Sequence, residues 1–486
     1  MSVLKFPLNA EQSTGVFWLA GTDPSGAVGG VCRVSGSDIE IEVTSPLTPW
    51  MEWDSGEQSV RARRIPEEKD LVLFGQLPVF PGPLTFVGAR TVARRATTVP
   101  GASAGPELHR LKADWCVASV HLEKADMQFS AVRARFTHLE LWARTQDLEM
   151  TQRTTRPLQT TVVYSPVDAT VTAFSEYGES ASMRLTSGAT VGMPGPWGTF
   201  VKTFDWLELD GLSGWTIAEC LTRFIRPVQN LLTLLAGEAC EILQIEVKAD
   251  DRWCAVYGSP VKPMAPQPED QKLLLDKAEL PLEQLASWCG LVGKLSPVPY
   301  VVASATAKEF ATVETEALAL TTTAEGLDRV LYPNARRFTA EDVEATIGEL
   351  EGTSIPETVR AALVQALKQY FYEDSYPTRM GRLAEYVSAV ASTCIGRPNR
   401  WKSEITSLRI DLAHALGQRP GSSDEAILLM HARNQSLRWA LLIRILLETG
   451  VPPEVLSRAL EESERYRRDS KRWRRQLPNL FPSESL

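Results

Sequence analysis

The stretch "DEAILLMHARNQSLRWALLIRILLETG", residues 424–450, decides the fold of the C-terminal part of the chain. Its apolar residues recur with helical spacing over about seven turns, at 3.6 residues per turn. Ser422 stands before Glu425 in the pattern of a helix start, and Gly450 followed by Pro452 forms a stop signal. The stretch therefore predicts one long helix within a helical region.

The helical pattern extends on both sides of this stretch. Thr339 precedes Asp342, and Ser354 precedes Pro356, as residues do where a helix starts. A bundle of roughly 170 to 180 residues has the size of an ordinary domain. We expect its helices near 306–331, 339–350, 355–372, 378–394, 403–416, 424–449 and 453–472.

The first half of the chain has the alternation of strands. Residues 214–239 break this pattern with helical spacing, and we expect Pro227 to kink that helix or to end its first part. The glycine-rich "GATVGMPGPWG" (188–198) lacks Gly-Lys-Ser/Thr and predicts a loop, and the proline-rich "SPVKPMAPQPED" (259–270) predicts a linker. The strand-like segments are "GVFWLAG", "GGVCRVSGSDIEIEV", "KDLVLFGQLPV", "MQFSAVRARFTHLELWA", "LQTTVVYS", "DATVTAFSEYG", "ASMRLTSG", "CEILQIEV" and "RWCAVYG".

The two patterns predict an α+β multidomain protein, because 486 residues are too many for one compact core. Residues 1–300 form the β-rich part, an antiparallel sheet, sandwich or incomplete barrel, with a short helix at "PLEQLASWCGLVG". Residues 303–477 form the helical domain, and residues 478–486 a tail.

Composition favours a cytoplasmic protein with no membrane segment and no metal site. No apolar run reaches the roughly 18 residues of a spanning helix, and the start lacks a secretory signal. The 7 cysteines are scattered singly, which favours reduced thiols and gives no zinc-ligand spacing. His109, His121 and His138 also lack metal-ligand spacing and are expected to be strand or loop residues.

The net charge of −9 is unevenly distributed. "RYRRDSKRWRR" (465–475) carries seven basic residues and one acidic residue, enough to neutralise several phosphates of an RNA, although a solvated basic helix end also explains it. His431 shares the long helix with Arg433, Asn434 and Arg438, which predicts a polar face. The candidate RNA-binding residues are Arg438, Arg467, Arg468, Lys471, Arg472, Arg474 and Arg475.

An arginine and a histidine stand five positions apart in "SLRIDLAHALGQRPG", residues 407–421. On one helix, Arg409 and His414 are separated by about 140° around the axis, so their side chains do not meet within one chain. Three readings remain: the helix bends or begins at Asp411, a second chain supplies the partner group, or the pair is a snorkelling arginine with an exposed histidine. The expected buried stripe of this helix is Ile405, Leu408, Leu412 and Leu416.

The form "LRIDLAHALG" inside a helical bundle resembles the signature of the HEPN superfamily, many of whose members are metal-independent ribonucleases acting as dimers. "FATVETEALALTTTAEGLDRVLYP", with Glu325, and "YPTRMGRLAEYV" resemble segments of its ApeA-like branch of bacterial anti-phage proteins. "GVFWLAGTDPSGAVGGV", "FTHLELWA" and "NLLTLLAGEACEILQIEV" are similar to the ApeA N-terminal domain. The resemblance implies that Arg409 and His414 are catalytic, with support from Glu325 and Asp411.

The implied chemistry suits these residue types. Histidine titrates near neutral pH and moves protons, while arginine offers a charged planar fork to phosphate oxygens. The resemblance implies cutting of host or phage RNA, tRNA or mRNA, without a cofactor, leaving 2′,3′-cyclic phosphate and 5′-hydroxyl ends. It also implies a homodimer or larger homo-oligomer and an N-terminal half that responds to a phage-derived trigger.

One position departs from the family pattern. The residue after the arginine is usually polar, and here it is Ile410, with Asp411 one place later. This departure favours one alternative, a non-catalytic HEPN dimer that binds RNA or a protein partner. A second alternative is a ligand-binding β-domain joined to a helical oligomerisation module.

Overall fold

The chain divides into two compact units. Unit 1 comprises residues 1–229 and 240–271, and unit 2 comprises residues 230–239 and 272–486, so the division falls inside helix α3 (Arg226–Ala236). The helical unit thus starts earlier than the predicted residue 303 and includes the end of α3. The computed structural model describes residues 12–35, 38–48, 51–56, 59–64, 70–79, 81–95, 108–123, 127–144, 146–153, 159–166, 169–191, 201–262, 272–368, 373–414 and 424–481.

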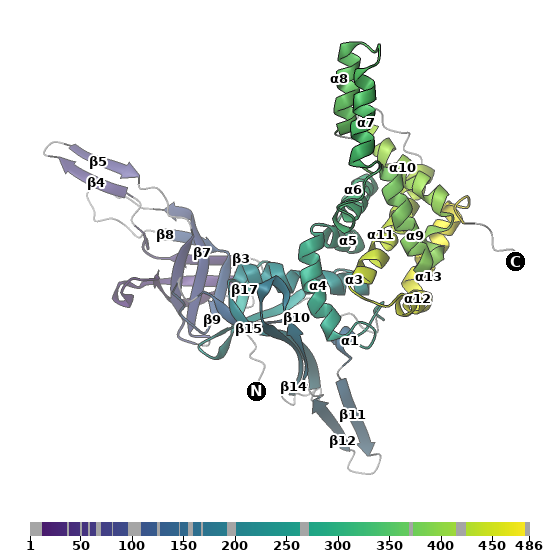
Figure 1. Ribbon diagram of the computed structural model, residues 1–486. Helices are drawn as coiled ribbons and strands as arrows, with labels where there is room; N and C mark the ends of the chain where they lie inside the picture. The colour runs from purple at the N-terminus through teal and green to yellow at the C-terminus, as the bar shows by residue number, and fades with distance from the viewer. Residues whose placement is uncertain are drawn as a thin grey trace. The chain divides into compact units, whose positions relative to one another are not determined.

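Unit 1 begins with a closed antiparallel barrel (Figure 1). Its strands follow the order β7-β6-β1-β2-β3-β8, and β8 pairs back onto β7. Alternating side chains such as Ile39, Ile41 and Val43 point inward and are fully or almost fully buried. The strands are β1 (Ser13–Leu19), β2 (Val28–Ser35), β3 (Asp38–Val43), β6 (Leu71–Gln76), β7 (Pro83–Arg95) and β8 (Leu108–Ala113).

Strand β7 belongs both to the barrel and to an open sheet. Leu84–Val87 of β7 pair with β9 (Trp115–Ala118), whereas Arg90–Arg95 pair with β8. The chain changes partner at Gly88, whose φ of +69° favours glycine and whose missing side chain leaves room for Asp114. A 2.6 Å ion pair between Arg90 and Asp114 lies at the same point.

From β9 the open sheet continues in the order β17-β16-β10-β15-β14-β13. Two separate two-stranded sheets are formed by β4 with β5 and by β11 with β12. The open-sheet strands are β10 (Phe129–Phe136), β13 (Thr170–Phe174), β14 (Ala181–Val191), β15 (Val201–Trp215), β16 (Ile242–Ala249) and β17 (Arg252–Gly258). The hairpin strands are β4 (Met51–Gly56), β5 (Ser59–Arg64), β11 (Gln146–Arg153) and β12 (Gln159–Pro166).

Three sequence predictions for unit 1 need correction. The segment "MQFSAVRARFTHLELWA", predicted as a strand, ends in a helix, α1 (Leu139–Ala143). Gly188–Val191 of the predicted loop extend β14, and residues 192–200 lie outside the described part. Helix α2 (Ile217–Cys220) does not end at Pro227. It passes through a π-helical turn, Leu221–Ile225, into α3, which contains Pro227 in its first turn. Most of the predicted linker, residues 263–271, also lies outside the described part.

Unit 2 is helical, and the predicted α+β multidomain class is confirmed. No helix in the described ranges is both long and apolar enough to cross a membrane. The helices of unit 2 that follow α3 are α4 (Leu282–Leu295), α5 (Val298–Thr306), α6 (Val313–Leu331), α7 (Ala340–Glu351), α8 (Glu357–Ala366), α9 (Tyr376–Ile395), α10 (Pro398–His414), α11 (Asp424–Glu448), α12 (Pro453–Glu462) and α13 (Glu464–Gln476).

Several predicted helix ends shift for local reasons. The predicted Thr339 capping box is present in α7, but α8 starts at Glu357, with Pro356 in place of the expected Ser354 at the capping position. Helix α10 starts at Pro398, earlier than the predicted residue 403. The expected helix over 453–472 is two helices, because the Ser463 side chain accepts a hydrogen bond from the Tyr466 amide and starts α13.

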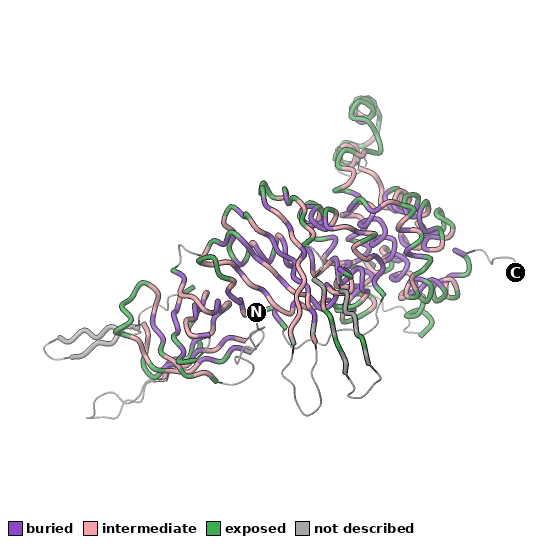
Figure 2. The backbone as a smooth tube through the Cα atoms, turned by 90° about the horizontal axis from the view of Figure 1, so that it is seen from below, coloured by how far each residue is buried: buried purple, intermediate pink, exposed green. Residues whose placement is uncertain are grey.

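Helices α7 and α8 form a hairpin that stands apart from the other helices of unit 2 (Figures 1 and 2). Within α7 and α8 only Val343 is buried, whereas Val359 and Leu363 are exposed. The core of unit 2 lies instead among α6, α9, α10 and α11, where Trp401 and Trp439 are buried.

Candidate active site

Arg409 lies on α10 and its guanidinium reaches α6. Ile405 and Leu408 are almost fully buried and fix the inner face of α10, as predicted, while Leu412 is only partly buried. Arg409 Nη2 lies 2.6 Å from Glu325 Oε2, and the side chain of Arg409 keeps 35% of its exposure. The arginine is therefore both anchored and open to solvent.

The Arg409 guanidinium lies over an aromatic ring. Its Cζ lies 4.4 Å from the centroid of the Tyr376 ring, at the start of α9. The Tyr376 hydroxyl lies 3.3 Å from the Thr321 carbonyl oxygen and donates to it. Burial raises the pKa of Tyr376 above its ordinary value, and the Arg409 charge opposes this only in part, so the tyrosine stays a neutral phenol.

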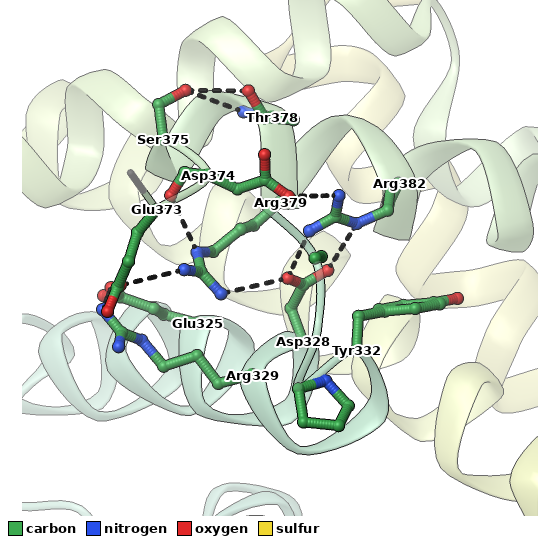
Figure 3. Close-up of polar contacts among 12 residues, drawn as sticks. Glu325, Asp328, Arg329, Tyr332, Glu373, Asp374, Ser375, Thr378, Arg379 and Arg382 are labelled. Carbon is green, nitrogen blue, oxygen red and sulfur yellow. Dashed lines mark hydrogen bonds and ion pairs between the residues drawn. The ribbon is translucent and has the colours of Figure 1, made fainter. Parts of the chain in front are cut away.

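Glu325 connects Arg409 to a second arginine. Arg329, one turn further along α6, lies 3.2 Å from Glu325 and 2.8 Å from Glu373 (Figure 3). The side chain of Glu325 keeps 17% of its exposure, so its carboxylate is partly shielded from water. Two cations therefore share this one carboxylate at the edge of the site.

Beneath Glu325 lies a buried ion network between α6 and α9. Figure 3 shows Asp328 between two arginines: Arg379 at 3.2 Å and Arg382 at 2.6 Å. Asp328 keeps 6% and Arg379 only 4% of the side-chain exposure. Asp374 pairs with Arg382 at 2.6 Å, and hydrogen bonding to Asp328 is the main cause that raises the pKa of Arg382. The network holds the start of α9, and hence Tyr376, against α6.

His414 is the last residue of α10, and its side chain lies outside the described part of the structure. The helix is continuous from Pro398 to His414, so the alternative in which it begins at Asp411 is wrong. The backbones of Arg409 and His414 therefore keep the separation of about 140° expected from helical geometry. Asp411 is exposed, and no described residue forms an ion pair with it.

The residue that departs from the family pattern, Ile410, is 49% exposed. On the neighbouring helix α11, Ile427 and Leu428 are 42% and 50% exposed. Helices α10 and α11 run antiparallel, since Arg433 pairs with Glu404 and the Trp401 indole donates to Ser436. That register places position 410 level with position 427, so the exposed apolar side chains share one end of the helix pair.

The predicted basic residues divide into an exposed set and a buried one. Arg474 is partly buried. Arg438 keeps 14% side-chain exposure, donates to the Ala305 carbonyl at 3.2 Å, and burial lowers its pKa. Arg438, on α11, is therefore not part of an exposed basic surface that could bind RNA. The exposed residues, spaced along one face of α13, are Arg467, Arg468, Lys471, Arg472 and Arg475.

The polar residues predicted around His431 connect helices. The Asn434 amide donates to the Val313 carbonyl at 2.9 Å, and Arg433 pairs with Glu404. Burial, the largest effect, lowers the pKa of His431, so the neutral ring is favoured. These contacts give the polar face a structural role.

The histidines of unit 1 make local contacts. Thr91 Oγ1 lies 2.9 Å from His109 Nε2, and His121 stacks on Phe74 with ring centroids 4.8 Å apart. His138 precedes α1 and is buried. Among the described residues, no group of three or more histidine, cysteine or acidic side chains is placed to hold a metal ion.

Sequence reasoning named Arg409 and Glu325 but gave no role to Tyr376, Asp328 or Arg379. Tyr376 falls inside "YPTRMGRLAEYV", a segment quoted for its resemblance to the family, but the sequence did not predict the contact between Tyr376 and Arg409. The spacing of Glu325 and Asp328 on one face of α6 was the available signal for an ion network. Compared with known proteins, the chain matches no family model, no curated protein and no solved structure.

Proposed function

We propose that the protein is an endoribonuclease of the HEPN type that acts in anti-phage defence. The observation that carries the proposal is Arg409: a cation anchored by Glu325 and Tyr376 yet open to solvent, five residues before His414. The resemblance in "LRIDLAHALG" supplies the reaction class. The β-rich unit would respond to a phage-derived trigger, and the resemblance alone supports this part.

The proposed reaction is a transesterification within RNA. The ribose 2′-oxygen attacks the adjacent phosphorus and loses its proton, the bond to the 5′-oxygen breaks, and that oxygen gains a proton. Arg409 stabilises the negative charge on the phosphate oxygens, and His414 moves a proton. The products are a 2′,3′-cyclic phosphate and a 5′-hydroxyl, and the resemblance implies that no metal takes part.

A homodimer accompanies the proposal. Arg409 and His414 diverge on one continuous helix, so a second copy facing the first would bring an arginine and a histidine to one scissile phosphate. The exposed Ile410, Ile427 and Leu428, at one end of the α10–α11 pair, support this arrangement, because an interface there would cover apolar side chains that one chain leaves open to solvent. The seven buried cysteine thiols are consistent with a reducing cytoplasm.

End-group analysis of cleaved RNA tests the reaction. We expect the wild-type protein, incubated with total RNA and EDTA and with or without phage-infected lysate, to yield cyclic-phosphate and 5′-hydroxyl fragments. Arg409→Ala and His414→Ala should each lower the rate by a factor of about 100 or more, since each removes charge stabilisation or proton transfer. Arg458→Ala, an exposed arginine on α12, is the matched control.

Cleavage that survives both Arg409→Ala and His414→Ala would contradict the assignment of this site. A non-catalytic RNA-binding dimer is the second candidate, and exposed Ile410 at the usually polar position favours it. Stable RNA binding without any cleavage, with and without lysate, would select this second function.

A further inference from the structure

The Arg409 guanidinium is restrained in two directions. Nη2 of the guanidinium forms an ion pair with Glu325 Oε2 at 2.6 Å, and its Cζ lies over the Tyr376 ring, 4.4 Å from the ring centroid. The side chain of Arg409 keeps 35% of its exposure, so part of the guanidinium is open to a ligand.

We infer that Tyr376 is a positioning residue for Arg409, an inference that rests on the proposed ribonuclease function. The ring does not touch the reacting atoms. It limits the movement of the guanidinium, so that the exposed part of the cation is held in position for a phosphate. A planar cation binds phosphate through two parallel hydrogen bonds only when that plane is oriented, which is why an aromatic support matters for arginine.

The tyrosine is itself rigidly supported. It is the first residue of α9, after Ser375, whose side chain accepts a hydrogen bond from the Thr378 amide. Arg379 Nε donates to the Asp374 carbonyl at 3.1 Å, and Arg382 pairs with the Asp374 carboxylate. These two arginines of α9 thus fix the backbone immediately before the ring.

The packing around Tyr376 separates its two groups. The hydroxyl points to the Thr321 carbonyl of α6, while the ring face meets Arg409 of α10. Removing the hydroxyl leaves the cation–π contact in place, and removing the ring abolishes it. If Tyr376 only filled space, a ring of the same shape would replace it whether or not the face of that ring attracts cations.

The test compares Tyr376→Phe, Tyr376→Leu and replacement of Tyr376 by pentafluorophenylalanine, a ring of similar shape whose face no longer attracts cations. We expect Tyr376→Phe to cleave RNA within roughly twofold of wild type, because phenylalanine keeps the contact. The other two should lower kcat by about 10-fold to 100-fold with KM little changed, because misplacement of a catalytic group acts on the transition state. The fluorinated ring keeps the test valid if Tyr376→Leu unfolds.

The matched control is Tyr386→Leu. Tyr386 lies on the same helix and also stacks on an arginine, Arg444 at 3.8 Å, but outside the contacts of Arg409. We expect its kcat to equal that of wild type. In an Arg409→Ala background, Tyr376→Leu should cause no further loss, since both residues act through one group.

The outcomes separate this inference from the proposed function. If the wild type does not cleave RNA, or Arg409→Ala has no effect, the proposed function fails. If Arg409→Ala lowers cleavage to a rate that is still measurable, two outcomes overturn the positioning role of Tyr376 while the ribonuclease stands. In the first, the fluorinated variant retains wild-type kcat; in the second, Tyr376→Leu adds a loss of its own in the Arg409→Ala background.

Discussion

At the scale of single residues, the candidate site depends on how charges are balanced inside unit 2. Arg409 and Glu325 could be named from the sequence, because both lie in segments with a recognisable pattern. The arginines that hold Asp328 could not, since a buried charge on α9 has the same sequence pattern as a solvated one. Only the fold shows that Arg379 is 4% exposed and paired.

Asp328→Asn tests the buried network. Removing its charge leaves the buried Arg379 with only Glu373, 3.3 Å away and 39% exposed, as an acidic partner, and breaking a buried pair costs about 3–5 kcal/mol. We expect the urea unfolding midpoint of the helical unit to fall accordingly, measured by circular dichroism. Glu462→Gln, at an exposed pair with Lys272, should leave the midpoint unchanged. An equal effect of the two substitutions would show that the Asp328 network does not stabilise the fold.

At the scale of elements, α13 presents its basic residues on one face and packs the other. Tyr466 and Trp473 are buried with ring centroids 5.8 Å apart, which fixes the rotation of the helix. A cationic face of this kind suits the RNA backbone, since binding to phosphates releases counterions.

Replacing Arg468, Lys471 and Arg472 by glutamine tests this face. We expect weaker RNA binding and a slope of log Kd against log salt concentration that falls by about 2, because each single-strand phosphate that is no longer neutralised lowers the slope by roughly 0.7. Fluorescence anisotropy of a labelled RNA measures both. Arg458→Gln on α12 removes one exposed charge outside this face and should change neither. An unchanged salt slope in the triple variant would show that these residues form a solvated helix surface and do not contact RNA.

Sequence reasoning located most elements but not all of their limits. Helix α11 and the capping box of α7 follow local rules and were predicted. The division at Ser463 was missed because one serine in a continuous apolar pattern is a weak signal for a helix start. Strands β7 and β15 were not predicted, because glycine and charged residues interrupt the alternation of apolar side chains. In the fold, hydrogen bonds to neighbouring strands on both sides stabilise each of them.

At the scale of the whole molecule, the two-part organisation was predicted, but the limit between the parts was not. The sequence pattern changes near residue 300, whereas packing assigns α4 and α5 to the helical unit. The end of α3 also belongs there, which linear reading cannot show because contacts distant in sequence decide it.

The proposed dimer gives a prediction at this scale. We expect the wild-type protein to be a dimer or larger, and Ile410→Asp with Ile427→Asp to shift it toward monomer and to lower RNA cleavage together, because buried charge opposes association. Light scattering coupled to size exclusion measures the mass. Val359→Asp, 48% exposed on α8, is the control and should leave the mass unchanged. A monomeric wild type that cleaves RNA would contradict the two-chain arrangement.

The strand shared by the barrel and the open sheet has a consequence for how unit 1 comes apart. Because β7 supplies hydrogen bonds to β6, β8 and β9, losing it would open the barrel and expose an edge of the sheet at the same time. We therefore expect the two halves of the unit to melt together, and a truncation that keeps only one of them would leave its part of β7 without a complete set of partner strands.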